Sequence, residues 1–344
     1  MWGLGRRSSA PHASVSKVRA LIIAQDARAL DDSDKRSAFM VELRKATGGT
    51  ASPILEALAD GEGVPLARSL ALLVAGETAS ASDIASICRI HNAAKTHTEK
   101  LAAVMALLTK RGEDPFSKAH KVAMQHPEIP GLSVKMGAVP STEAAKCVLA
   151  CLAEERKITW HAPLVWALTE AQEGMPEITD LIIQELLSSR GKGSIEFYLV
   201  SALSKAKSDK AVAVLRDYAS KEPEALALLA VSALVEQDTD TSVKDALDIL
   251  RQKDIASQAL LFQCLASSKN LVHATAIDEV LVNALQNGPK PKIRSAAAAA
   301  LSARTSSSVR SALEAALQKE SDAKVKAEIE KALGLLKKLQ QGKS

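Results

Sequence analysis

The sequence predicts an all-α fold, an α-solenoid of antiparallel helix pairs, and three observations lead to this prediction. Ile293-Arg294 and Val325-Lys326 open two similar stretches that lie 32 residues apart, and each continues into an apolar run rich in Ala or Leu. A period of this length is typical of repeats that hold two helices each. Hydrophobic residues make up 47% of the chain but aromatic residues only 3%. The core must therefore form from close contacts between helices rich in Ala and Leu, which favour helix.

The second observation is a leucine that recurs near the end of each predicted second helix, at intervals of 31 to 36 residues. Each leucine closes an apolar run whose members recur at steps of three and four, as one helix face requires. These leucines are Leu168, Leu203, Leu234, Leu265, Leu301 and Leu333. The third observation is that the strict alternation of strands is absent, so we expect nearly all helix and no strand.

The repeat pattern resembles a known family. From about Ala144 to Leu336 the chain resembles HEAT or armadillo-type repeats, and the best match is Asp322-x-x-Val325-Lys326 followed by Ala332-Leu333-Gly334. The middle units depart from the pattern, since Ala225-Leu226 lacks the basic residue. The resemblance implies a curved stack of HEAT-like helix pairs whose usual role is to hold protein partners.

The chain divides into five predicted segments. They are a basic, acid-free segment at 1–25, degenerate helical repeats at 26–126, a Pro/Gly-rich loop at 127–140, HEAT-like repeats at 141–337 and a polar tail at 338–344. The first segment has the composition of a mitochondrial or plastid transit peptide; the alternative is a basic tail that leads into a helix through Val18 and Ile22. The loop is too rich in proline to continue a helix. It is either a surface excursion or a hinge or docking loop.

Charge and motifs favour neither catalysis nor nucleic-acid binding. The net charge is +4, and four basic residues precede the first acidic residue, so the remainder of the chain is neutral overall. A neutral chain of this kind is not expected to bind nucleic acid. The sequence lacks a phosphate-binding loop, a His-Glu-x-x-His motif and a Gly-x-Ser-x-Gly elbow. Cys147 and Cys151 are interpreted as small buried side chains because no further metal ligand has suitable spacing. We predict no enzymatic activity, no cofactor and no transmembrane helix.

The candidate partner-binding residues are Trp160, Arg294, Arg304 and Lys326. Second helices line the inner curve of HEAT-like stacks, and Trp160 lies near a predicted helix end, whereas Trp166 is expected to pack in the core. The other non-core residues predicted on this inner surface are Ser232, Glu236, Gln258, Gln263 and Glu328. Their mixed signs favour a protein partner over a polyphosphate.

The predicted function is a non-catalytic helical-repeat scaffold, a structural subunit of a large protein complex. In size, repeats and leader composition the chain resembles the HEAT-like peripheral-stalk subunits of chlorophycean green-algal mitochondrial ATP synthases. That resemblance implies a mitochondrial location in an inner-membrane complex on the matrix side; a scaffold in the cytoplasm is the alternative. Two other classes stay open: a HEAT-type accessory protein such as a chromophore lyase or chaperone, and a nucleic-acid-binding repeat protein.

Overall fold

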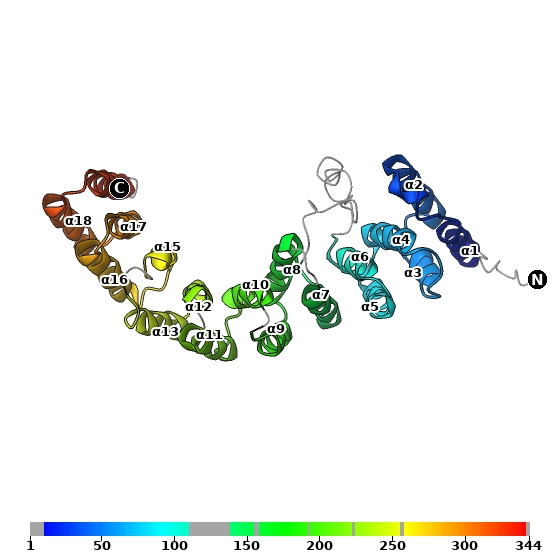
Figure 1. The fold of residues 1–344 in the computed structure, drawn as a ribbon, viewed down its shortest axis with the longest axis horizontal. Helices are drawn as coiled ribbons and strands as arrows, with labels where there is room; N and C mark the ends of the chain where they lie inside the picture. The colour runs from blue at the N-terminus through cyan, green and yellow to red at the C-terminus, as the bar shows by residue number, and fades with distance from the viewer. Residues whose placement is uncertain are drawn as a thin grey trace, which may run out of the picture. The chain divides into compact units, whose positions relative to one another are not determined.

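A computed structural model describes residues 10–109, 138–154, 158–191, 193–221, 224–254 and 258–341. These residues form helices joined by turns, and no strand occurs among them (Figure 1). The prediction of an all-α solenoid is confirmed. The chain falls into two compact units, Met1–Glu185 (unit 1) and Leu186–Ser344 (unit 2). The division lies within one helix, not at the predicted loop 127–140, most of which lies outside the described residues.

Unit 1 begins with helices whose ends are fixed by neighbouring residues. Asp32 accepts hydrogen bonds from the backbone N–H groups of Asp34 and Lys35 and so caps the second helix, which Gly48 ends with a φ of 61°. The helices of this unit are α1 (Ala10–Ile23), α2 (Ser33–Thr47), α3 (Ser52–Leu58), α4 (Pro65–Thr78), α5 (Ile84–Ala93), α6 (His97–Leu108), α7 (Thr142–Glu154), α8 (Ile158–Ala171) and most of α9 (Pro176–Ser188).

The first helix packs against other helices of unit 1. Val18 and Ile22 are buried, and α1 contacts α3. Gly63 has a φ of 94°, and a Cβ atom built there would lie 2.7 Å from Ile22 Cγ2, so the approach of this turn to α1 requires glycine. Arg19 also forms an ion pair with Asp60. The helix through Val18 and Ile22 that the sequence offered as the alternative to a leader is therefore present.

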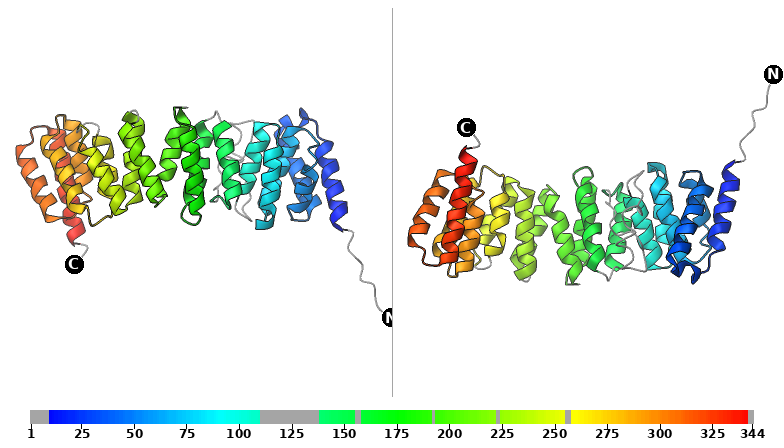
Figure 2. Two further views of the ribbon diagram at one scale, coloured as in Figure 1. Left: turned by 90° about the horizontal axis from the view of Figure 1, so that it is seen from below. Right: turned by 90° about the horizontal axis from the view of Figure 1, so that it is seen from above.

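Unit 2 consists of two layers of helices (Figures 1 and 2). One layer holds the first helix of each pair, and the other, which we call the inner layer, holds the second helices. The first helices are α11 (Asp209–Lys221), α13 (Asp240–Leu250), α16 (Ala274–Asn287) and α18 (Ser307–Lys319). The inner layer comprises α10 (Ser194–Ala202), α12 (Glu224–Gln237), α15 (Phe262–Ser267), α17 (Pro291–Leu301) and α19 (Ala323–Gln341), and its successive members contact one another. Because α19 continues to Gln341, most of the predicted tail 338–344 is part of the last helix.

The recurring leucines form the core of unit 2, as predicted, with one exception. Leu203, Leu234, Leu265 and Leu301 are fully buried. Leu333 is only half-buried, because the buried stripe of α19 runs through Val325, Ile329, Ala332 and Leu336. In α17 the fully buried residues include Ala297, Ala298 and Ala300. Their small side chains allow α17 to lie close to its neighbours.

Candidate partner-binding surface

From α10 to α17, the inner layer of unit 2 presents mainly uncharged side chains to solvent between the ends of its helices. Buried residues occupy one face of each helix, and the residues between them are half-buried or exposed. From α10 to α17 these residues include Phe197, Ser201, Leu229, Ser232, Leu260, Gln263, Ala296 and Ala299. Charged residues such as Glu236 and Lys292 lie near helix ends. This surface is less charged than the sequence predicted, because Arg294 and Arg304 form ion pairs with Glu320 and Asp278.

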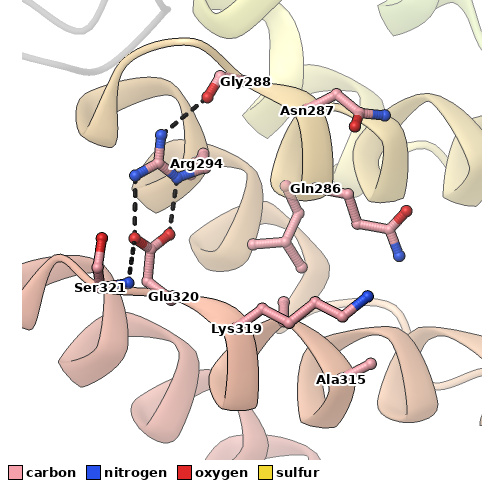
Figure 3. Close-up of a pocket in the computed structure, with 10 residues that line it drawn as sticks. Gln286, Asn287, Gly288, Arg294, Ala315, Lys319, Glu320 and Ser321 are labelled. Atoms are coloured by element: carbon pink, nitrogen blue, oxygen red, sulfur yellow. Dashed lines mark hydrogen bonds and ion pairs between the residues drawn. The ribbon is translucent and has the colours of Figure 1, made fainter.

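Arg294 joins two successive turns of unit 2. From the first turn of α17, its Nε and Nη2 atoms donate to the two carboxylate oxygens of Glu320 at 2.7 and 2.9 Å, and Nη1 donates to the carbonyl of Gly288 at 2.9 Å (Figure 3). The Glu320 carboxylate also accepts hydrogen bonds from the backbone N–H groups of Ser321 and Asp322. Arg294 above all, with these two N–H groups, lowers the pKa of Glu320 to about 2. Both side chains are largely buried, so the pair is a structural contact between the α16–α17 and α18–α19 turns.

Arg304 makes an equivalent connection from the turn after α17. Its Nε donates to Asp278 Oδ1 at 2.7 Å, while Nη1 and Nη2 donate to the carbonyls of Ser268 and Ala274. The other Asp278 oxygen accepts a hydrogen bond from the Ser306 hydroxyl at 2.9 Å. Arginine suits this role because its planar fork can bind a carboxylate and carbonyls together. Arg304, in the α17–α18 loop, thus contacts both α16 and the loop that precedes it.

Each arginine borders a small hollow in the surface. The first hollow has a volume of about 450 Å³, and Figure 3 shows Arg294, Glu320, Lys319 and the amides of Gln286 and Asn287 around it. The second has a volume of about 300 Å³ and is lined by Arg304, Asp278 and residues of the adjoining loops. In both hollows the guanidinium is already neutralised by a carboxylate. The linings supply hydrogen-bonding groups suited to polar groups of a protein partner.

The four candidate partner-binding residues have different surroundings in the structure. Arg294 and Arg304 direct their charges into ion pairs within the chain, whereas Lys326 is exposed on α19. Trp160 belongs to α8, and its side chain lies outside the described residues. A partner contact by any of the four stays a prediction. Gln258, predicted on the inner surface, is instead buried and donates to the carbonyls of Leu250 and Lys253.

The prediction that Trp166 packs in the core is wrong, because its side chain is 46% exposed. The buried residues of α8 on either side of it are Leu164, Val165, Ala167 and Leu168. The steps of three and four among Leu164, Ala167, Leu168 and Ala171 leave Trp166 on the solvent side of the helix. Its position outside this stripe was a signal in the sequence. An exposed tryptophan is a common anchor in protein interfaces.

Two kinds of site were sought among the described residues. That part of the chain contains no cluster of three or more His, Cys, Asp or Glu side chains able to hold a metal ion. It also contains no helix with the length and apolar character needed to span a membrane. Cys147 and Cys151 are buried on α7, as interpreted from the sequence.

Comparison with known proteins identifies one family. The family described as HEAT repeats matches residues 243–334, which is less than half of the 344 residues. The matched stretch runs from α13 into α19 and includes both ion pairs, the one between Arg294 and Glu320 and the one between Arg304 and Asp278. No curated protein matches the chain. The match and the helical fold confirm the similarity to a HEAT-type helical-repeat protein.

Proposed function

We propose that this protein is a non-catalytic scaffold that holds a protein partner on the inner layer of unit 2. The observation that carries the proposal is the series of uncharged, solvent-facing side chains from Phe197 on α10 to Ala299 on α17. Apolar and small polar groups can be covered without the cost of desolvating unpaired charges. The partner should therefore present a protein segment with an apolar, largely uncharged face.

The same surface is a poor match for nucleic acid. Binding to a polyphosphate draws most of its affinity from lysines and arginines that contact phosphates. Two arginines that could have supplied such contacts, Arg294 and Arg304, are instead paired with Glu320 and Asp278. The similarity to HEAT repeats over residues 243–334 also favours a protein-holding role.

Leu260 provides the sharpest test of the inner layer. Its side chain is 73% exposed just before α15, so Leu260→Asp should leave the fold intact. An aspartate buried against an apolar partner would lose its hydration without gaining a counterion. We expect about a tenfold loss of affinity for the partner, which corresponds to roughly 1.4 kcal/mol. The measurement is the fraction of tagged chain that migrates in a complex on a native gel after expression in its natural host.

Leu271→Asp is the matched control. Leu271 is 87% exposed in the α15–α16 loop, away from the helix faces of the inner layer. Loss of the complex with Leu260→Asp but not with Leu271→Asp supports the proposal. An equal effect of both substitutions, or none, contradicts the inner layer as the binding surface. A wild-type chain that migrates only as a free monomer would contradict the scaffold role itself.

We also propose that the complex is mitochondrial and that it is the peripheral stalk of an ATP synthase. A stack of helices that pack against one another would give such a stalk stiffness. The composition of residues 1–25 supports this location. Because α1 is packed into unit 1, removal of all 25 residues would expose the neighbours of Val18 and Ile22. A cleaved targeting segment should therefore end before Ala10.

Cell fractionation tests the location. After gentle detergent extraction of mitochondria, the chain should co-migrate with a respiratory-chain or ATP-synthase complex, and its N-terminal peptide should begin no later than Ala10. A known matrix enzyme that does not belong to these complexes serves as the control for non-specific co-migration. Recovery of the chain only from the cytosol would contradict the mitochondrial proposal while leaving the scaffold proposal intact.

A further inference from the structure

Two neighbouring turns of unit 2 carry lysines that are exposed to solvent. The turns, α16–α17 and α18–α19, are joined by Arg294, whose guanidinium donates to the carbonyl of Gly288 in one turn and to the carboxylate of Glu320 in the other. The lysines lie within a few residues of these contacts, at the end of α18 and at the starts of α17 and α19. We call this set the basic edge; its members, all exposed, are Lys290, Lys292, Lys319, Lys324 and Lys326.

The lysines of the basic edge have no carboxylate partner. The stretch 286–326 contains eight basic and three acidic residues. Each of its three arginines is already paired with a carboxylate, and the pairs are Arg294–Glu320, Arg304–Asp278 and Arg310–Glu314. The remaining acid, Asp322, accepts hydrogen bonds from the backbone N–H groups of Lys324 and Val325 at the start of α19. None of the five lysines forms an ion pair with another residue that the structure describes, so their charges can meet a ligand.

The lysines also recur with the period of the repeat. Lys292 and Lys324 lie 32 residues apart, each directly before the β-branched residue that begins the buried stripe of its helix. Equivalent residues of successive repeats take equivalent places in a solenoid, so these charges follow one edge of the inner layer. The hydrogen bonds of Arg294 hold the two turns together. An anionic ligand would therefore bind a set of charges whose backbone is already ordered.

We propose that the basic edge binds an acidic segment of a protein partner, whose carboxylates pair with these lysines. Lys319 lines the hollow beside Arg294, which has a volume of about 450 Å³, together with the side-chain amides of Gln286 and Asn287 (Figure 3). An acidic side chain can enter this hollow and reach the Lys319 ammonium, while the amides bind peptide groups next to it. The flat surface of a membrane would reach only the lysines outside the hollow.

Nucleic acid fits the basic edge less well than an acidic protein segment. The phosphates of nucleic acid are closely and regularly spaced, so a binding surface needs many basic groups without acids among them. Asp322 lies among the lysines, and the arginines that could bind phosphate with two hydrogen bonds are already paired. A protein segment can place its carboxylates opposite the lysines and away from Asp322. The proposal does not depend on the apolar contact proposed for the inner layer, because the contacts here are ionic and lie on the turns.

Binding of a defined acidic peptide tests the proposal. The probe is a fluorescein-labelled decapeptide in which glutamate alternates with glycine, and the reference is the same peptide with glutamine in place of glutamate. Fluorescence anisotropy with the purified full chain at low ionic strength should show binding of the glutamate peptide only, weakening as salt screens the charges. The double variant Lys292→Glu, Lys324→Glu should bind it about tenfold more weakly, because two attractive contacts become repulsive.

The matched control is the double variant Lys207→Glu, Lys244→Glu. Both lysines are exposed in unit 2, before α11 and on α13, so the change in net charge is the same at a different place. We expect less than about a twofold loss of affinity, since exposed charges at a distance are screened. Circular dichroism of both double variants verifies that they are folded.

Three outcomes would overturn the proposal. The first is equal binding of the glutamate and glutamine peptides, and the second is an equal loss of affinity in the two double variants. The third comes from parallel measurements with duplex DNA and with vesicles of phosphatidylcholine and phosphatidylserine. Tighter binding of either one than of the peptide at physiological salt, lost in Lys292→Glu, Lys324→Glu, would assign the basic edge to phosphate groups instead of protein carboxylates.

Discussion

Replacing Ala298 with aspartate is expected to destabilise unit 2 by about 3–5 kcal/mol. Ala298 is fully buried on α17 beside Ala297 and Ala300, where the closely packed helices leave no room for a larger side chain. The substitution would add both volume and an unpaired carboxylate to this core. Urea denaturation followed by far-ultraviolet circular dichroism gives the change in the free energy of unfolding. In a solenoid each repeat contacts only its neighbours, so the loss should concentrate in the transition of unit 2.

Ala315→Asp is the matched control for this substitution. Ala315 lies within α18 and is exposed, so the same change of residue there costs helix propensity but buries no charge. We expect a loss below about 1 kcal/mol. If Ala298→Asp is no more destabilising than Ala315→Asp, then the assignment of Ala298 to the core of the stack is wrong.

Replacing Glu320 with glutamine is expected to destabilise unit 2 by about 2 kcal/mol at neutral pH, the loss typical of hydrogen bonds to a charged group. The wild-type carboxylate, 7% exposed, accepts two hydrogen bonds from Arg294 and two from backbone N–H groups. Glutamine keeps a similar shape but leaves the Arg294 charge without a counterion. Urea denaturation of wild type and variant provides the comparison.

The difference between wild type and Glu320→Gln should depend on pH. The pKa of Glu320 falls from 4.5 in the reference state to about 2 in the folded chain. A carboxyl group with a lowered folded-state pKa stabilises the fold above its unfolded-state pKa. That stabilisation is lost as the pH falls from about 4.5 to about 2, so the two proteins should converge in stability over this range.

Glu314→Gln is the control for a general effect of charge. Glu314 is exposed on α18, and its nearest cationic atom, Arg310 Nε, is 3.9 Å away. An exposed pair of this kind contributes little. A wild-type curve that stays parallel to that of Glu320→Gln down to acid pH would show that the Arg294–Glu320 pair does not supply the pH-dependent stability.

The helical stack could be predicted from the sequence because its signal is repeated. Leu203, Leu234, Leu265 and Leu301 each terminate a similar apolar run, and a burial pattern of period 3.6 needs no knowledge of distant residues. A local signal such as Pro65 at the start of α4 also fixes a helix start, since the preference of proline for the first helical turn depends on that residue alone.

The side-chain partners could not be predicted in the same way. The sequence around Arg294 contains no nearby acidic partner, because Glu320 lies 26 residues later and meets Arg294 only when the two turns stack in the fold. Asp278 and Arg304, which form the second ion pair, are also 26 residues apart in the sequence. Trp166 differs from the prediction for another reason: a large apolar side chain usually lies in the core, but its position on α8 is outside the buried stripe.

The arginine pairs constrain how the gene for such a protein can lengthen or shorten. Arg294 reaches the acid that precedes α19, and Arg304 reaches back to the acid on α16. A recombination event that deleted α18 and α19 would orphan the Arg294 guanidinium, and one that deleted α16 would orphan Arg304. A duplicated segment would be tolerated best when it carries both an arginine and the carboxylate that pairs with the arginine of the preceding repeat. The ion pairs therefore restrict which boundaries between repeats allow a repeat to be exchanged without leaving an arginine unpaired.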